Sequence, residues 1–146
     1  MRTPKSVAVL LERELASTIK EWLRQVKLIP DLTNIPLSDS DRTGHLRKLF
    51  GDLLCRLRLP RDTEPRISIT ASAHGRLRFA QGYSASMLVE ESRLFQVTTF
   101  GTLHLHQSEL DQSEVLLDVI AIADEADRQL TETVRSFMTA QQAAAA

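Results

Sequence analysis

The sequence is poor in the residues and runs that mark secreted, membrane-spanning or turn-rich proteins. Its single cysteine, Cys55, allows no intramolecular disulfide, which argues against a secreted cysteine-stabilised domain. The longest apolar run, residues 7–11, ends at Glu12, far short of the ~20 residues that span a bilayer. The N-terminus has no recognisable signal peptide, so we expect a cytoplasmic protein that neither spans a membrane nor is exported.

Glycine and proline are also scarce, with five of each in 146 residues. The long stretches without these residues favour helices over a turn-rich β architecture. The apolar fraction of 42% and the charged fraction of 25% are ordinary for a globular protein, and the length suits one domain. We therefore predict a single all-α helical bundle of about five helices over residues 1–140, followed by a low-complexity tail at residues 141–146.

The net charge of −1 hides an asymmetry along the chain. Residues 1–107 carry 16 Lys and Arg against 11 Asp and Glu, whereas residues 108–146 carry 2 against 8. The acidic C-terminal segment is therefore predicted to lie against the basic body of the same chain or of a second copy. The densest basic group (Arg56, Arg58, Arg61 and Arg66) is local and does not cover a whole surface, which argues against nucleic acid as a partner.

Apolar residues at spacings of three and four define the predicted helices. Their ranges are 3–28, 38–59, 66–81, 84–103 and a last helix that starts near Ser108 or Ser113. Pro4 suits the first turn of the first helix, Ser38 or Asp39 can cap the second, and Ser84 can cap the fourth. Residues 67–70 alternate like a strand, but no second alternating run offers a pairing partner, so a helix is favoured there.

The last predicted helix carries an apolar stripe about six turns long. Its residues are Val115, Val119, Ile122, Ala126, Leu130, Val134 and Phe137. A bundle can cover such a stripe only along its own length, so we predict a homodimer in which the C-terminal part packs against a second copy. The acidic residues that flank the stripe (Asp118, Asp124, Glu125 and Asp127) would then face basic residues of the other subunit such as Arg24, Lys27 or Arg56.

The residues that could perform chemistry form no recognisable motif. His45 and His74 lie on different segments without a neighbouring cysteine, and His104 and His106 would point apart on a helix. Cys55 stands among leucines and is predicted to be a small core residue rather than a reactive thiol. Neither a glycine-rich phosphate loop nor a serine nucleophile motif occurs, so we expect no catalytic residue, no metal and no cofactor.

The most distinctive segment of the sequence, residues 73–91, predicts a helix, a tight corner and a second helix. Its polar and turn residues are His74, Arg78, Gln81, Gly82, Tyr83 and Ser84. The first three share one helix face, the glycine is expected to end that helix with a positive φ, the tyrosine to pack into the corner, and the serine to cap the next helix. Any tight corner needs such residues. A functional interpretation adds that His74 and Arg78 point polar groups into an inter-helix pocket or toward a partner.

This segment resembles a motif of a known protein family. From His74 to Glu91 the pattern HG-x-x-R-x-x-x-GYS-x-x-x-LV-x-E is similar to the RsbRD-type N-terminal sensing domain. That domain precedes STAS domains in stressosome co-antagonists and kinase cores in soluble sensor histidine kinases, and it occurs in some transcriptional regulators. Trp22 in an early helix and residues 124–126 in a long final helix match as well. Arg93 matches the first of two arginines that follow the glutamate in the family, whereas Gln96 replaces the second.

The resemblance implies a helical input module, distantly similar to globins that have lost haem, with no catalytic residue and no cofactor. Its ligand or signal corner would comprise His74, Arg78, Gln81, Gly82, Tyr83, Glu91 and Arg93. The final helix would relay a stimulus to an output module such as a histidine kinase or STAS domain, and any kinase activity would lie downstream. Two alternatives stay open: a constitutive interaction or dimerisation scaffold, and a small-molecule or haem-type binder with a pocket between helices.

Overall fold

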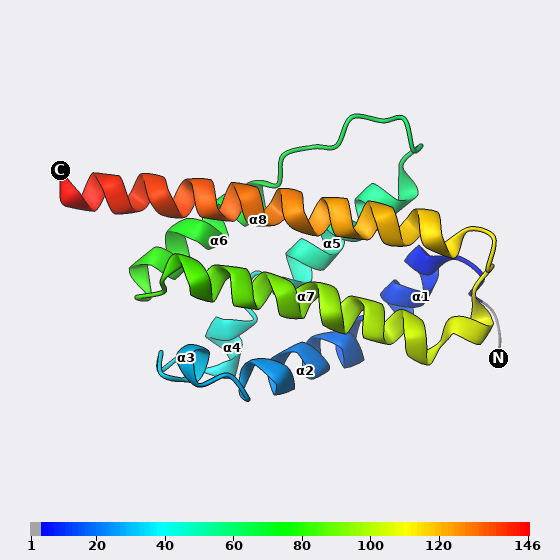
Figure 1. The fold of residues 1–146 in the computed structure, drawn as a ribbon, viewed down its shortest axis with the longest axis horizontal. Helices are drawn as coiled ribbons and strands as arrows, with labels where there is room; N and C mark the ends of the chain where they lie inside the picture. Colours follow the sequence, from blue (N-terminus) through cyan, green and yellow to red (C-terminus); the bar gives the residue numbers. More distant parts are fainter. Residues whose placement is uncertain (1–3) are drawn as a thin grey trace.

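The computed structural model describes residues 4–146, and within this range every regular element is a helix (Figure 1). The elements are α1 (Val7–Arg13), α2 (Leu15–Val26), α3 (Pro30–Thr33), α4 (Asp39–Arg42), α5 (Leu46–Arg58), α6 (Ile69–Ala80), α7 (Ala85–Leu105), the 3-10 helix η1 (Gln107–Glu109) and α8 (Val115–Ala145). The predicted all-α bundle with a long C-terminal helix is thereby confirmed.

The predicted first helix is broken into α1 and α2 at Glu14. This residue leaves the helical region at φ −97° and ψ 17°, and its carbonyl oxygen accepts a hydrogen bond from the Thr18 hydroxyl at 2.8 Å. The Thr18 amide still donates to the same oxygen at 2.9 Å, so the hydroxyl adds a second hydrogen bond to that carbonyl, an arrangement often found where a helix bends. The prediction of Pro4 in a first helical turn is also wrong, because α1 begins at Val7 and is capped by the Ser6 hydroxyl.

The predicted second helix is interrupted as well. Ser38 is the N-cap of α4, since its hydroxyl accepts a hydrogen bond from the Asp41 amide at 3.1 Å. The helix then ends at Arg42, because Thr43 leaves the helical region at φ −99° and ψ 5°. The break turns the chain between α4 and α5 and places the last carbonyl groups of α4 beside α6.

Helices α6 and α7 form the predicted helix-corner-helix. α6 begins at Ile69, slightly later than predicted, because the Ser68 hydroxyl caps it by accepting a hydrogen bond from the Ala71 amide at 3.0 Å. The strand alternative for this segment is not realised. Gly82 has a φ of +92°, the one positive φ among residues 4–146, and Ser84 caps α7. The conformation that only glycine adopts without strain therefore lies at the predicted corner.

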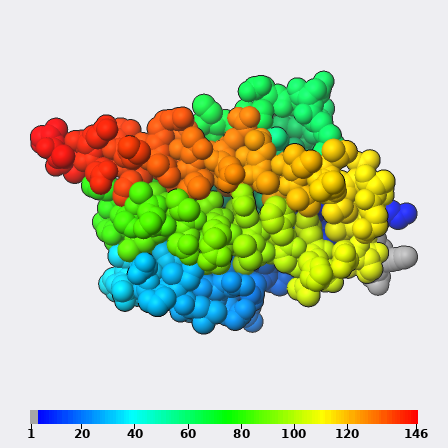
Figure 2. Space-filling model, viewed as in Figure 1, coloured from blue at the N-terminus to red at the C-terminus, as the bar shows by residue number. Residues whose placement is uncertain are grey.

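Helix α8 is the longest element of the bundle. It packs against α5, α6 and α7, and its C-terminal end projects beyond the other helices (Figures 1 and 2). It starts at Val115, later than predicted, and stays helical through the predicted low-complexity tail to Ala145. Alanine and glutamine are good helix formers, so the tail prolongs the helix instead of ending it.

The apolar core lies where the stripes of the long helices meet. Leu10, Phe50, Leu53, Leu94 and Ile122 are almost completely buried there. The rings of Phe50 and Phe95 pack with centroids 4.5 Å apart. Of the helices between residues 4 and 146, none combines the length and the apolarity that a membrane crossing requires.

Candidate functional site

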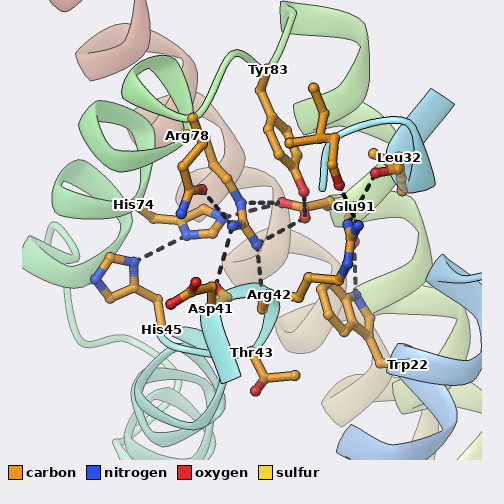
Figure 3. A network of polar contacts seen from close by, with 12 residues as sticks. Trp22, Leu32, Asp41, Arg42, Thr43, His45, His74, Arg78, Tyr83 and Glu91 are labelled. Carbon is orange, nitrogen blue, oxygen red and sulfur yellow. Dashed lines mark hydrogen bonds and ion pairs between the residues drawn. The ribbon is translucent and has the colours of Figure 1, made fainter. Parts of the chain in front are cut away.

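Glu91 stands at the centre of a buried polar cluster where α4, α6 and α7 meet (Figure 3). Its side chain is only 5% exposed. Arg78 donates through Nε to Glu91 Oε1 at 3.1 Å and through Nη2 to Oε2 at 2.9 Å, and the Tyr83 hydroxyl donates to Oε2 at 2.8 Å. A two-pronged contact between a guanidinium and a carboxylate is among the strongest ion-pair geometries in proteins.

Arg78 is completely buried and ties three helices together. In addition to Glu91, it donates through Nη1 to Gln81 Oε1 at 2.8 Å and through Nη2 to the Arg42 carbonyl oxygen at 2.7 Å. Its Cζ atom lies 4.7 Å from the centroid of the Tyr83 ring, a cation–π contact. The Arg42 carbonyl belongs to the C-terminal end of α4, where helix carbonyls lack partners inside the helix. One side chain therefore fastens α4 to both α6 and α7.

Two further buried side chains join the cluster to more distant parts of the chain. Arg42 donates to the carbonyl oxygens of Leu32, at 3.0 Å, and Ile35, which holds the segment after α3 against the bundle. The Trp22 indole N–H donates to the Glu91 carbonyl oxygen at 3.2 Å. The motif on α6 and α7 is thus anchored by α2 and α4 as well.

His74 links the carboxylate to a second imidazole. Its Nε2 atom lies 3.2 Å from Glu91 Oε1, and its Nδ1 atom lies 3.1 Å from Nδ1 of His45 (Figure 3). A carboxylate only accepts, so the His74 Nε2 carries a proton; in the neutral pair, Nδ1 of His74 then accepts from Nδ1–H of His45. Burial first, and then the nearby charges of His74, Arg78 and Lys48, lower the pKa of His45. Only one proton can lie between the two Nδ1 atoms, so one of them must be the acceptor.

Opposing effects set the pKa of Glu91. Burial is the largest effect and raises it, but the hydrogen bond from His74, the charges of Arg78 and His74, and the hydrogen bond from Tyr83 together outweigh burial. The pKa of Glu91 therefore lies below its ordinary value. Burial and the Glu91 charge raise the pKa of Tyr83, so its hydroxyl keeps its proton and remains a donor.

A small cavity of about 40 Å³ lies beside the cluster, between Trp22, His74, Glu91, Phe95 and Gln129. That volume holds about three water molecules, whereas pockets for small organic ligands measure roughly 300–1,000 Å³. A haem group does not fit there without a rearrangement of the helices. The haem-type alternative therefore finds no preformed pocket at this corner.

The structure brings most of the predicted corner residues together. His74, Arg78, Gln81, Tyr83 and Glu91 all belong to one hydrogen-bonded network, and Gly82 supplies the turn between the two helices. Arg93 does not take part. Its side chain is about half exposed and pairs with Glu90 on the surface of α7 at 3.0 Å.

Arg42 and Gly75 were not singled out from the sequence, and His45 was considered there only as a possible metal ligand or base, not as a neighbour of His74. Arg42 and His45 lie far from the motif, inside a segment predicted as one continuous helix, and only the tertiary fold brings them to it. Gly75 did carry a signal. A glycine inside a helix costs about 1 kcal/mol relative to alanine, so its presence indicates a packing requirement.

Gly75 allows α6 to approach α8 very closely. A Cβ atom at this position would overlap with the Thr133 carbonyl oxygen and the Ser136 hydroxyl, and would lie only 3.0 Å from the Phe137 nitrogen. The Thr133 hydroxyl also donates across the interface to the Ala71 carbonyl oxygen at 3.1 Å. His74 and Gly75 therefore connect the polar cluster to α8, because one residue contacts Glu91 and the next contacts α8.

The predicted stripe of α8 packs inside the chain. Ile122, Ala126 and Phe137 are buried, and Val115, Val119, Leu130 and Val134 pack partly buried against the core. Helices α5, α6 and α7 cover the stripe, so it does not need a second copy. The acidic side of α8 pairs within the chain too: Arg56 lies 2.9 Å from Asp124, and Arg61 lies 3.0 Å from Asp118.

Cys55 is exposed, so the prediction that it belongs to the core is wrong. The buried face of α5 is formed by Leu46, Leu49, Phe50, Leu53 and Leu54. The next residue after Leu54 is rotated by about 100° and leaves that face. Within residues 4–146, no three His, Cys, Asp or Glu side chains gather as a metal site would require.

A second buried glutamate, Glu125 on α8, is held less favourably than Glu91. Its Oε1 atom lies 3.5 Å from Nη1 of Arg56, and its Oε2 atom accepts a hydrogen bond from Gln129 at 3.1 Å. Burial is the largest effect on its pKa, and together with the nearby charge of Asp52 it raises that pKa above the ordinary value.

The two glutamates should make opposite contributions to the pH dependence of stability. Because the pKa of Glu91 is lowered, its contribution is present above the ordinary glutamate pKa and is lost as the pH falls through the lowered value. Because the pKa of Glu125 is raised, its contribution is present below the ordinary value and is lost as the pH rises through the raised value. Relative to wild type, Glu91→Gln should therefore cost more stability at pH 7 than at pH 4, whereas Glu125→Gln should be more favourable at pH 7.

Urea unfolding followed by the fluorescence of the buried Trp22 would measure both effects. For each variant, the quantity compared is its difference from wild type in the free energy of unfolding. If this difference changed in the same direction between pH 4 and pH 7 for both variants, the assignment would be contradicted.

The chain matches no model of a known protein family, and the searches of curated proteins and of solved structures find no match either. The resemblance to the RsbRD-type domain and the finer likeness to a globin therefore stay predictions.

Proposed function

We propose that this chain is a non-catalytic input domain that relays a stimulus or a partner contact through α8 to an output module in the cytoplasm. The output module would be a histidine kinase core or a STAS domain, as the resemblance implies. Any kinase activity would then lie in that module and not in the helices described above.

The observation that carries this proposal is the direct contact of α6 with both the buried cluster and α8. A change at His74 or Arg78 acts on α6, and α6 meets α8 through Gly75 without an intervening side chain. Tightly packed interfaces shift between discrete arrangements rather than deforming smoothly. The projecting C-terminal end of α8 then offers the change to a partner (Figure 1).

A chimera would test the relay. The chain is joined through α8 to the dimerisation helix of a histidine kinase core, and autophosphorylation is measured for Arg78→Lys and for the matched control Arg24→Lys. Lysine cannot reproduce the two-pronged contact of Arg78 with Glu91, whereas Arg24 is an exposed residue that pairs with Glu21. We expect Arg78→Lys to change activity by about fivefold or more, the effect of a coupling free energy of ~1 kcal/mol.

Circular dichroism would show that both chimeras remain folded. Equal activity in the two folded variants would contradict the relay and favour the alternative of a constitutive interaction scaffold, in which the cluster only stabilises the fold.

A further inference from the structure

We propose that a hollow between α8 and the loop from α5 to α6 binds a small organic amine through its alkylammonium group. The proposal does not depend on the input role. The loop, residues 59–68, passes beside α8 on its way to α6 (Figure 1). We call the space between them the loop hollow. It borders α8 as far as Arg135 and leaves the projecting C-terminal end of that helix free.

The loop hollow consists of two adjoining spaces, of about 220 Å³ and about 390 Å³. They adjoin because Arg66, Ile67, Ser68 and Glu125 border both of them. Pockets that hold small organic ligands measure roughly 300–1,000 Å³. In contrast to the cavity of about 40 Å³ beside Glu91, the loop hollow therefore has room for an organic molecule.

Glu125 borders the loop hollow with an oxygen atom that lacks a close donor. Its side chain is only 5% exposed. Gln129 donates to Oε2 at 3.1 Å, whereas the donor to Oε1, Nη1 of Arg56, is 3.5 Å away. Charge-assisted hydrogen bonds between nitrogen and a carboxylate are ordinarily about 2.7–2.9 Å long, so Oε1 can accept a stronger bond.

The arginines nearest to Glu125 are bound to other carboxylates. Arg56 and Arg128 both pair with Asp124, at 2.9 Å and 2.8 Å. Arg135, which also borders the loop hollow, pairs with Glu132 at 2.9 Å. Glu125 is therefore a buried carboxylate with only one long ion-pair contact.

A second carboxylate, Asp52 of α5, borders the smaller space. Its Oδ2 atom accepts a hydrogen bond from the Ser68 hydroxyl at 2.6 Å, and its charge helps to raise the pKa of Glu125. Two carboxylates that face one space repel each other unless a proton or a cation lies between them. An alkylammonium group brings one positive charge and three N–H donors, which suits this position.

Apolar side chains line the opposite wall and favour an organic cation over a metal ion. The wall includes Leu59, Pro65, Ile67 and Ile69, of which Ile67 is 74% and Ile69 is 84% exposed. An alkyl chain that extends from the ammonium group would cover these side chains, as the stem of a lysine covers apolar surface. A bare metal ion would gain nothing from them.

Isothermal titration calorimetry with the diamine cadaverine should give a dissociation constant below ~1 mM at low ionic strength. Glu125→Gln should weaken binding by about tenfold or more, because it removes the buried charge that the ammonium group meets. The matched control Glu90→Gln makes the same charge change on the surface of α7 and should leave the dissociation constant within about twofold. Circular dichroism would confirm that both variants are folded. Nuclear magnetic resonance should locate the amine-induced shifts at residues 66–69 and 125–129.

Arg66 provides a test of opposite sign. It borders both spaces but belongs to none of the ion pairs between residues 4 and 146. Its positive charge repels a cationic ligand or competes with it, so Arg66→Gln should tighten cadaverine binding by about threefold. Weaker binding by this variant would contradict the proposed position of the ammonium group.

Binding should also depend on pH. Cadaverine should bind more weakly at pH 4 than at pH 7, because the raised pKa of Glu125 leaves its carboxyl group protonated at the lower pH. The methylamide of acetyl-lysine tests whether the ammonium group comes from a partner protein instead. Its tighter binding would overturn the assignment to a small amine, and its weaker binding would support it. Absence of cadaverine binding at about 10 mM, or equal losses in Glu125→Gln and Glu90→Gln, would overturn the site itself.

Discussion

Gly75→Ala should lower the free energy of unfolding by about 2 kcal/mol or more, even though alanine is the better helix former. The added methyl group would overlap with the Thr133 carbonyl oxygen, which is part of the α8 backbone and cannot rotate away. The overlap can therefore be relieved only if α6 and α8 move apart, and packing is then lost along both helices. Overpacking of this kind costs ~1–3 kcal/mol and sometimes more, against a gain of up to ~1 kcal/mol in helix propensity.

The chain contains a matched control for this substitution. Gly51 lies inside α5, and a Cβ atom there would meet nothing within 4 Å. Gly51→Ala should therefore raise the free energy of unfolding by about 0.5–1 kcal/mol, through propensity alone. Thermal or urea unfolding of both variants would give effects of opposite sign. A stabilising effect of Gly75→Ala would mean that α6 and α8 are not in close contact.

Arg78→Met should lower the free energy of unfolding by about 3–5 kcal/mol. Methionine fills part of the space but leaves the buried Glu91 carboxylate and the Arg42 carbonyl oxygen without their strongest donors. Removal of one partner from a buried ion pair costs this much because the other charge stays buried and unpaired. The same substitution at the exposed Arg24 should cost less than about 1 kcal/mol.

A second substitution would separate the charge effect from a loss of packing. In the Arg78→Met background, Glu91→Leu removes the unpaired carboxylate and should recover part of the lost stability, measured by urea unfolding. If the double variant is less stable than Arg78→Met alone, the unpaired charge is not the main cause of the loss.

The periodicity of apolar residues predicted the class of the fold and the positions of the long helices, but not their breaks. At the break, the Glu14 carbonyl oxygen accepts a second hydrogen bond, from the Thr18 hydroxyl at 2.8 Å. That hydroxyl also lies 2.7 Å from the Thr102 hydroxyl of α7. The end of α4 accompanies the hydrogen bond from Arg78 to the Arg42 carbonyl oxygen. The spacing of apolar residues within one segment cannot predict contacts between residues so far apart in the sequence.

The candidate site was predictable where its residues share one motif. Spacing on the helix placed His74, Arg78 and Gln81 on one face, and the packing of Tyr83 into the corner was expected from the turn. Glu91 was assigned to the same corner by the family resemblance and not by helix geometry. Periodicity also showed that one stripe of α8 is apolar, but it could not show which surface covers that stripe. The structure gives that role to the chain's own helices and leaves a second apolar edge, around Ile120, exposed.

The close contact at Gly75 divides α8 into two unequal arms. From the contact, at residues 133–137, the helix runs about 30 Å back to Val115 but only about 15 Å forward to Ala145. If α8 behaves as a rigid lever that pivots at this point, a displacement of its C-terminal end becomes about twice as large at its start. The long arm ends at Val115, a few residues after η1, whose Glu109 pairs with Arg13 of α1 at 2.8 Å. A spectroscopic label near this ion pair would therefore report motion of α8 with greater sensitivity than a label at the C-terminal end.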